Sequence, residues 1–260
     1  MDDSRIDSAV RQPAPTRGRG RLALAAGALR AAAALRLAEP EIRGLHHLVG
    51  SGDVCFDVGA AYGMYTFPLA HLVGPEGAVH SFEPQQRPRA LLAAVRSAVG
   101  ATHVRLSDRG VGRVAGQLPL VLPVRYRLPI SGHAHFADGL SPSGARPGLV
   151  SRGTRVPVTT VDDVCAAHGI ERVHFIKADV EGFEPEVLED AAGVLERDRP
   201  ALLLEIEDRH LSRYGRTAAD VSGHLLDRGY SMSTWRDGCW QAAEGVALGT
   251  RNYLFRTAAD

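Results

Sequence analysis

From Asp53 onward, short apolar runs alternate with helical patterns, and this alternation limits the fold more than any other feature of the sequence. Short apolar runs bounded by glycine, proline or polar residues are typical of buried strands. The strand candidates are residues 54–58, 78–82, 103–106, 173–178 and 201–206. Helical patterns separate them at about 88–99, at 161–168 and after Glu184. The alternation predicts an α/β fold with a doubly wound, mostly parallel sheet.

Three regions do not follow this alternation of strand and helix patterns. Residues 110–158 are rich in proline, glycine and serine and too long for a plain connector, so we predict an inserted hairpin with a loop that covers an acceptor site. The C-terminal part of the sequence predicts an antiparallel pair of strands that completes the sheet, formed by residues 230–235 and 252–256. Residues 1–44 predict a polar arm followed by a helix over 21–40, which covers the domain formed by residues 45–260. A helix lying on a membrane surface is the less favoured interpretation of 21–40.

The charge balance and the cysteines exclude several classes of protein. Thirty acidic residues balance thirty basic ones, which argues against broad nucleic-acid binding because that needs a clustered positive field. Three scattered cysteines without a CxxC pair favour a reduced, cytoplasmic setting and give no zinc ligand set. No uncharged apolar stretch reaches the roughly 18 residues of a transmembrane segment.

The stretch 57-DVGAAYGMYTF-67 indicates a ligand-binding turn between a strand and a helix. Gly59 and Gly63 let the backbone pass close to a ligand, and Glu83, at the end of the next strand, is placed to accept both hydroxyls of a ribose. A dinucleotide and S-adenosylmethionine both fit this pairing. The glycine spacing is not that of a pyrophosphate loop, and Asp57 would repel phosphate but suits a ligand that carries an ammonium and a sulfonium.

The only lysine in the chain, Lys177, lies in 173-VHFIKADVEGFE-184, whereas the other 29 basic residues are arginine. Strand alternation puts Lys177 and Asp179 on the same side at the carboxyl end of a buried strand, where open α/β sheets bind ligands. An ammonium there can hold or release a proton in a way that a guanidinium cannot. A purely structural Lys–Asp pair is the alternative. Val173 stands where a short-chain dehydrogenase would need tyrosine, which excludes that class.

Five segments in order resemble the FkbM family of S-adenosylmethionine-dependent methyltransferases: FDVGAAYGMYTFPLA, GAVHSFEP, VTTVDDV, VHFIKADVEGFEPEVLEDA and RPALLLEIE. The resemblance implies a class I methyltransferase fold, which is Rossmann-like, and O-methylation of a hydroxyl on a sugar, an oligosaccharide or a glycosylated or other secondary metabolite. The segment 110–158 departs from the family pattern and leaves the acceptor open. The alternative function is a non-catalytic regulator or partner subunit that binds S-adenosylmethionine.

The resemblance also implies roles for individual residues. Lys177, Asp179 and Glu181 are the candidate catalytic residues. The implied cofactor-binding residues are Asp57, Gly59, Ala60, Tyr62, Gly63, Tyr65, Thr66, Glu83, Ser107, Asp108, Arg109 and Asp179.

A sugar hydroxyl is a poor nucleophile at neutral pH, so a general base is expected. The histidines His133, His135 and His210 are further candidates, less well placed than Lys177 and Asp179. Magnesium is an open alternative, since Asp179, Glu205, Glu207 and Asp208 end neighbouring strands and carboxylate oxygens suit this ion. The interpretation without a metal is favoured, because carboxylates at strand ends are common without one. An RNA acceptor is disfavoured, and a homo-oligomer is compatible with the sequence.

Overall fold

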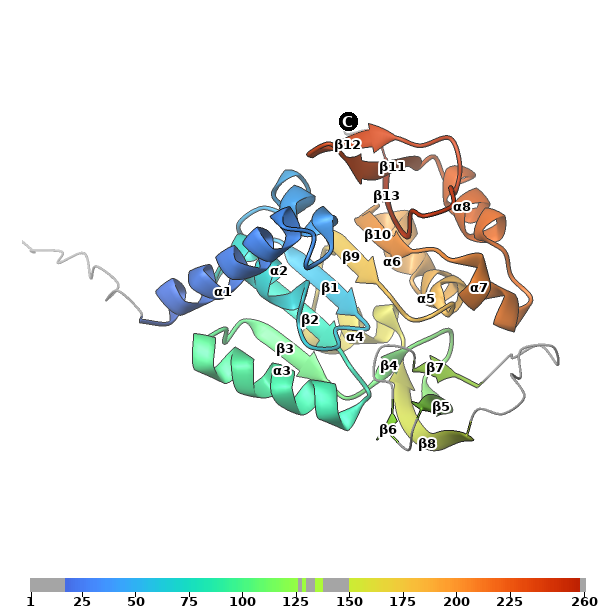
Figure 1. Cartoon of the computed structure of the whole chain (residues 1–260), viewed down its shortest axis with the longest axis horizontal. Coiled ribbons are helices and arrows are strands. Elements are labelled where there is room, and N and C mark those ends of the chain that lie inside the picture. Colours follow the sequence, from blue (N-terminus) through green and yellow to red (C-terminus); the bar gives the residue numbers. More distant parts are fainter. Residues whose placement is uncertain (1–16, 126–127, 130–133, 138–149, 258–260) are drawn as a thin grey trace, which may run out of the picture.

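An eight-stranded sheet forms the middle layer of the molecule (Figure 1). The computed structural model describes residues 17–125, 128–129, 134–137 and 150–257. The strand order is β12-β11-β13-β10-β9-β1-β2-β3, and the five strands from β10 to β3 are parallel. They are β1 (Val54–Val58), β2 (Ala78–Phe82), β3 (Val104–Ser107), β9 (Phe175–Ala178) and β10 (Ala201–Glu205). The mostly parallel sheet predicted from the apolar runs is confirmed.

Three antiparallel strands extend the sheet beyond β10. They are β13 (Asn252–Arg256), β11 (Ser231–Arg236) and β12 (Cys239–Ala242). The predicted pairing of residues 230–235 with 252–256 is confirmed as β11 with β13. The strand β12 was not predicted.

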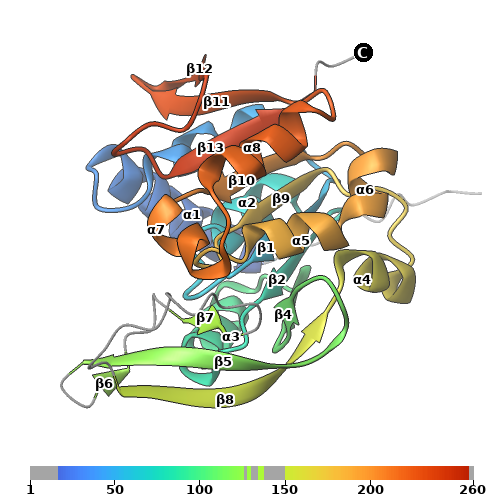
Figure 2. The ribbon, with the colours of Figure 1, turned by 90° about the vertical axis from the view of Figure 1, so that its right-hand side faces the viewer.

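Helices cover both faces of the sheet (Figures 1 and 2). One apolar cluster joins the sheet to α1 (Arg17–Ala34), η1 (Pro40–His47), α2 (Thr66–Val73) and α3 (Gln86–Val99). The other joins it to α4 (Val161–His168), α5 (Glu184–Asp190), α6 (Ala192–Arg197), α7 (Asp208–Leu211) and α8 (Ala218–Leu226), with the short η3 (Ser212–Tyr214) after α7. Strand alternation explains the two clusters, because Phe175 belongs to the first and Ile176 to the second. The doubly wound arrangement is thus confirmed.

Helix α1 begins earlier and ends earlier than the sequence predicts. It stops at Ala34, and two residues later the backbone of Arg36 takes a left-handed conformation with φ of 59°. The backbone of Glu39 is extended because the proline that follows it disfavours helical geometry at the preceding residue. Helix η1 then begins at Pro40. Helix α1 packs against α2, α3 and η1. None of the helices in the described ranges has the length and apolar character needed to cross a bilayer.

A second, smaller sheet lies beside the carboxyl edge of the main sheet, with β5 and β8 as its long antiparallel pair (Figure 2). It consists of β4 (Gly110–Val111), β5 (Gly116–Arg125), β6 (Leu128–Pro129), β7 (His135–Phe136) and β8 (Val150–Thr159). The predicted inserted hairpin is therefore present. His133 and most of the predicted covering loop lie outside the described residues. Phe136 packs against Phe183 and accepts a hydrogen bond on its carbonyl from the hydroxyl of Tyr214 at 2.7 Å, so the second sheet is fixed to the main domain.

Candidate functional site

The strand register brings the predicted site residues to one edge of the main sheet. Asp57 in β1 lies opposite Ser81 in β2 and Lys177 in β9. Because the strands are parallel, their carboxyl ends and the loops that follow them meet at this edge. The glycine loop, Glu83 and the KADVEG segment therefore lie together, although they are far apart in the sequence.

The glycine loop after β1 has no room for side chains at its two glycines. Gly59 has φ of +83°, and a Cβ atom there would lie 2.0 Å from the carbonyl oxygen of Asp179. Gly63 has φ of +88°, and a Cβ atom there would lie 2.6 Å from Leu92. The backbone N–H groups of Gly59 and Ala60 both donate to the carbonyl of Phe82, at 3.1 and 3.0 Å. The loop is thus fixed to the end of β2 and passes close to β9.

Asp57 lies beneath this loop and is only 2% exposed. It accepts a hydrogen bond from the Thr66 hydroxyl at 2.5 Å, which ties β1 to the first turn of α2. Burial raises the pKa of Asp57 to about 6, although Thr66 and Lys177 act to lower it. Tyr65 is buried, whereas Tyr62 is 51% exposed. Asp57, Thr66 and Tyr65 are therefore buried beneath the loop, whereas Tyr62 is exposed to solvent.

Glu83 is buried at the end of β2, where the sequence places an acid for a ribose. Its Oε2 accepts from the N–H of Ala61 at 2.9 Å and its Oε1 accepts from the N–H of Gln85 at 2.7 Å. Burial raises the pKa of Glu83 to about 7, and the two backbone bonds oppose this rise. Each oxygen keeps a second lone pair for a ligand hydroxyl.

A pocket with about 640 Å³ of empty space, including its open mouth, extends from the glycine loop. Gly59, Glu83 and Asp179 line it from the main sheet. Leu120 and Phe136 line it from the second sheet, so this sheet shares the cavity with the predicted cofactor residues. Ser107, Asp108 and Arg109, in contrast, line a separate groove beside β3. The contacts with adenine that the resemblance implies for these three residues stay a prediction.

Lys177 is 1% exposed and lies on the face of the sheet that α2 and η1 cover. Its Nζ atom donates to Oδ1 of Asn252 at 3.1 Å and to the carbonyl of Ala178 at 3.3 Å, and it lies 5.1 Å from the centre of the Tyr65 ring. Burial lowers the pKa of Lys177, but the carboxylates around it, chiefly Asp179 and Glu39, raise it above its usual value. The side chain is therefore a fixed ammonium at neutral pH.

Three carboxyl groups converge at the ends of β9 and β10. Asp179, Glu181 and Glu205 each offer an oxygen, and these oxygens lie within 4.8 Å of one another. Burial and the neighbouring Asp179 raise the pKa of Glu205, which favours a proton shared between these two carboxyl groups. Burial also acts to raise the pKa of Asp179, but Lys177 and the hydrogen bond from Glu205 lower it. The oxygens of these three carboxyl groups suit a divalent cation. A proton shared between Asp179 and Glu205 already relieves the repulsion between their carboxylates without a metal.

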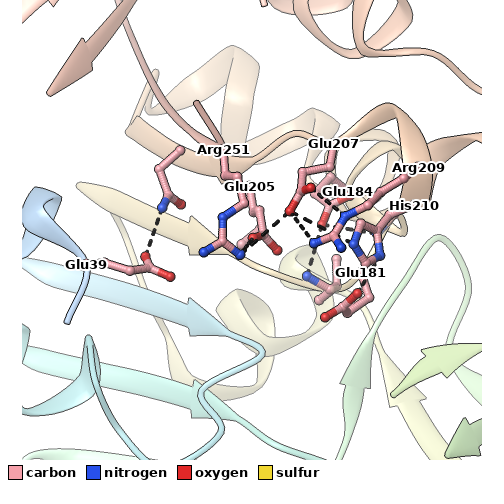
Figure 3. A network of polar contacts seen from close by, with 12 residues as sticks. Glu39, Glu181, Glu184, Glu205, Glu207, Arg209, His210 and Arg251 are labelled. Atoms are coloured by element: carbon pink, nitrogen blue, oxygen red, sulfur yellow. Dashed lines mark hydrogen bonds and ion pairs between the residues drawn. The ribbon is translucent and has the colours of Figure 1, made fainter. Parts of the chain in front are cut away.

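The other two acids considered for a metal have different partners. Asp208 accepts a hydrogen bond from the N–H of Ala218 at 2.7 Å. Glu207 forms a two-bond pair with Arg209, at 2.5 and 2.8 Å, and Arg251 lies 3.7 Å from it (Figure 3). Arg251 also pairs with Glu205 at 3.2 Å. We call Glu205, Glu207, Arg209 and Arg251 the arginine cluster.

Glu181 is held in an unusual backbone conformation beside a histidine. Its φ of 58° is rare for a residue with a side chain, and such strain gathers at functional sites. Its carboxylate pairs with Nδ1 of His210, which is 3% exposed (Figure 3). Buried Glu184 fixes the turn by accepting from the N–H groups of Val180 at 3.0 Å and Gly182 at 3.4 Å. Of the predicted histidines, His210 reaches the site and His135 lies in β7.

Two residues that the sequence did not predict complete the surroundings of Lys177. Glu39, between α1 and η1, accepts hydrogen bonds from the Tyr65 hydroxyl at 2.6 Å and from Nδ2 of Asn252 at 2.9 Å. Asn252 begins β13 and is 5% exposed. No sequence signal marked either residue, because 213 positions separate them. We call Glu39, Asp57, Tyr65, Lys177 and Asn252 the lysine cluster.

Comparisons with known proteins agree on the family of the chain. A model of the FkbM methyltransferase domain matches residues 57–232. The chain is also 31% identical over 191 residues to the 31-O-demethyl-FK506 methyltransferase FkbM of Streptomyces tacrolimicus, covering 66% of this chain and 72% of that protein. The chain belongs to the FkbM methyltransferase family. It is therefore an S-adenosylmethionine-dependent methyltransferase, and the resemblance seen in the sequence is confirmed.

A solved FkbM methyltransferase from Methylobacillus flagellatus KT has the same fold, with a TM-score of 0.50 and 17% identity. The match covers 79% of this chain but only 44% of that one. The class I methyltransferase fold is thus confirmed.

The residues of this FkbM methyltransferase fit the cofactor that the family uses. The backbone of Gly59 lines the pocket, and Glu83 retains acceptor capacity for the two ribose hydroxyls. Asp179, whose pKa is lowered, offers a carboxylate to a cationic ligand. Leu120 and Phe136 offer an apolar surface suited to the purine ring.

Proposed function

We propose that the chain is an O-methyltransferase that methylates a hydroxyl of a sugar, an oligosaccharide or a glycosylated or other secondary metabolite. The observation that carries the proposal is the meeting of Asp179 and Glu181 at one end of the pocket that holds Gly59 and Glu83. A carboxylate at that point is placed to receive a proton from an acceptor. The S. tacrolimicus relative is named for methylation of 31-O-demethyl-FK506, and this name supports a hydroxyl acceptor.

In the proposed mechanism, bound S-adenosylmethionine supplies the methyl group and leaves as S-adenosylhomocysteine. Glu83 holds the ribose and Asp179 faces the methionine end. Glu181 orients the acceptor hydroxyl and takes its proton on a carboxylate oxygen as the new C–O bond forms. Leu120 and Phe136 of the second sheet line the pocket and would limit the access of water to the reaction.

His210 supports Glu181 in this role. Its Nδ1 atom contacts the Glu181 carboxylate, and its Nε2 atom lies 4.0 Å from Glu207. The contact with His210 fixes the Glu181 side chain.

For Lys177 we propose a role as a fixed positive charge in turnover. The sequence left proton chemistry open for this residue. Full burial and a raised pKa favour an ammonium that stays protonated and holds Asp57 and Asp179 in their ionised forms. Lys177 is thus a positioning residue, whereas Glu181 is the proposed base.

Two measurements test the proposal in sequence. Calorimetry with S-adenosylhomocysteine and with NAD must give binding to the first alone. A screen with methyl-labelled S-adenosylmethionine then covers monosaccharides, oligosaccharides and macrolides with a free hydroxyl. Transfer to a hydroxyl that is lost in Glu181→Gln, with S-adenosylhomocysteine binding retained, supports the proposal. Binding of S-adenosylhomocysteine without transfer to any hydroxyl would favour the alternative, a non-catalytic binding subunit.

A further inference from the structure

We propose that Glu39 is a positioning residue for methyl transfer, and that the segment 17–47 is therefore part of the active site. Glu39 lies outside the part of the chain that matches the FkbM domain, residues 57–232, and so does its partner Asn252. The sequence assigned residues 1–44 to an arm and a helix that covers the methyltransferase domain or its active site. The contacts of Glu39 join this segment to the centre of the site.

The fold holds Glu39 at a fixed place. Pro40 follows it directly, and η1 is anchored by the fully buried side chains of Ile42 and Leu45. The indole N–H of Trp240 in β12 donates to the carbonyl of Gly44 at 3.3 Å. A Cβ atom at Gly44 would lie 2.5 Å from the Trp235 ring, so the C-terminal strands pack directly on this turn. Glu39 is thus tied to the C-terminal strands, and to α2 through Tyr65.

The chemistry of the contacts gives Glu39 a specific task. A carboxylate only accepts hydrogen bonds, so Glu39 takes the NH₂ end of the Asn252 amide. The carbonyl end of the same amide is then turned toward the Lys177 ammonium, 3.1 Å away. If the amide were reversed, its NH₂ group would face the ammonium and leave a buried cation without this acceptor. Glu39 therefore orients the acceptor that holds Lys177.

The effect reaches the cofactor site through charge. Lys177 lies opposite Asp57 in the strand register and two residues before Asp179, which lines the pocket. A displaced ammonium would change the field at both carboxylates, where the methionine end of the cofactor is expected. The inference rests on the proposed function only for its turnover measurement, because binding of S-adenosylhomocysteine is measured without any acceptor.

Exchanging the acid and the amide tests the proposal. Glu39→Gln removes the carboxylate that orients Asn252, and Asn252→Asp sets a second carboxylate against Glu39. We expect each single variant to bind S-adenosylhomocysteine about 10-fold more weakly and to lose about 10-fold or more in kcat. In the double variant, the amide introduced at position 39 can donate to the carboxylate introduced at position 252, which still accepts from Lys177. We expect it to recover at least about 5-fold over the weaker single variant in both measurements.

Glu41→Gln is the matched control. Glu41 lies in the same segment and is also buried, and burial raises its pKa to about 7, so an amide of the same size replaces an acid that is about half neutral at pH 7. We expect binding and kcat within about 2-fold of the parent. Melting temperatures separate positioning from folding, since Glu39→Gln should lose binding and kcat while it remains folded at the assay temperature.

Three outcomes would overturn the proposal: losses that simply add in the double variant, an unchanged kcat in Glu39→Gln, or an equal loss in Glu41→Gln. If a single variant is too unstable to assay, the exchange is read in the double variant alone, which must recover folded protein and S-adenosylhomocysteine binding. Failure to recover them would overturn the proposal as well. An absence of turnover on every hydroxyl, with the exchange pattern intact in binding, would count against the O-methylation proposal alone.

Discussion

The lysine cluster and the arginine cluster lie at the same edge of the sheet but differ in their access to water. Lys177 is 1% exposed, whereas the side chains of Arg251 and Arg209 are 54% and 53% exposed. A buried charge must be compensated by fixed partners, because desolvation costs several kcal/mol per ion. An exposed pair is screened and contributes about 0–1 kcal/mol. The basic residues of the two clusters therefore have different surroundings, and we expect the buried cluster to set the geometry of the site.

This comparison explains the single lysine. An ammonium is compact and can be enclosed by Asn252, the Tyr65 ring and nearby carboxylates, whereas a guanidinium is wider and has five N–H donors to satisfy. Among the arginines that the structure describes, none is buried, whereas Lys177 is.

The largest effect is expected when the buried charge is removed. Lys177→Met leaves the carboxylates around it without their counter-ion, so we expect the free energy of unfolding to fall by about 3–5 kcal/mol. Urea unfolding measures this loss. Lys177→Arg keeps the charge but overfills the space, and we expect a loss of about 1–3 kcal/mol and of about 10²-fold in kcat. If Lys177→Met has the same free energy of unfolding as the parent, burial does not make the charge of the lysine cluster more important for stability than the charges of the arginine cluster.

Glu181 lies near Glu205 of the arginine cluster and tests where chemistry takes place. Glu181→Gln keeps the size and the contact to His210 but cannot accept a proton, so we expect kcat to fall by about 10²-fold or more. The dissociation constant of S-adenosylhomocysteine should change by less than about 3-fold. Single-turnover kinetics measure the first quantity and calorimetry the second. If Glu181→Gln has the kcat of the parent, Asp179 or His210 is the base instead.

Glu83 sharpens the comparison from the cofactor side, since it is buried and its two oxygens accept from backbone N–H groups. Glu83→Ala should weaken binding of S-adenosylhomocysteine by about 1–3 kcal/mol, because the ribose hydroxyls lose their acceptor. The ionised form accepts both hydroxyls and its pKa is about 7, so affinity should rise as the pH increases through 7 and fall below it. Calorimetry between about pH 6 and pH 8 checks both expectations, and Glu83→Ala should lack the pH dependence.

Within the second sheet, the pocket wall and the remaining loop are predicted to differ in effect. Phe136→Ala removes part of the apolar wall, so we expect S-adenosylhomocysteine binding to weaken by about 1–2 kcal/mol. Shortening residues 138–148 should instead leave that binding unchanged and broaden or abolish the use of acceptors. Calorimetry combined with the acceptor screen separates the two effects. Equal losses of cofactor binding would show that the whole insert serves the cofactor.

The smallest effect is expected in the arginine cluster. Arg209→Ala removes an exposed partner of Glu207, and we expect a change in the free energy of unfolding below about 1 kcal/mol that shrinks further in high salt. Urea unfolding at two salt concentrations measures it. A loss comparable with that of Lys177→Met would mean that water access does not separate the clusters.

The parts of the site that could be predicted are those encoded locally. Apolar runs predict the strands. Glycines at positions where a Cβ atom would clash with its neighbours mark the loop after β1. Alternation within β9 places Lys177 and Asp179 near each other without any knowledge of the fold. Glu181 could be predicted as part of the site, but its pairing with His210 could not, because that contact depends on how the segment after β10 folds back.

The remaining parts depend on contacts between distant segments. Glu39 and Asn252 meet because η1 packs on the C-terminal strands, and no local pattern encodes that packing. The insert was predicted as a hairpin, yet its share in the pocket wall follows from the packing of Phe136 on Phe183. Its strands also contain prolines such as Pro119 and Pro123, which weaken a strand pattern in the sequence.

The sole lysine also gives the molecule a spectroscopic reporter. Incorporation of ¹⁵Nζ-lysine labels one side chain in the whole chain, and that side chain is fully enclosed at the centre of the site. Enclosure slows exchange of the ammonium protons with water, so one nitrogen resonance should be visible where exposed lysines would be broadened away. Its chemical shift would follow the arrival of cofactor and acceptor without any engineered probe. Amine-directed reagents should likewise leave this side chain unmodified while the protein is folded and modify it on unfolding.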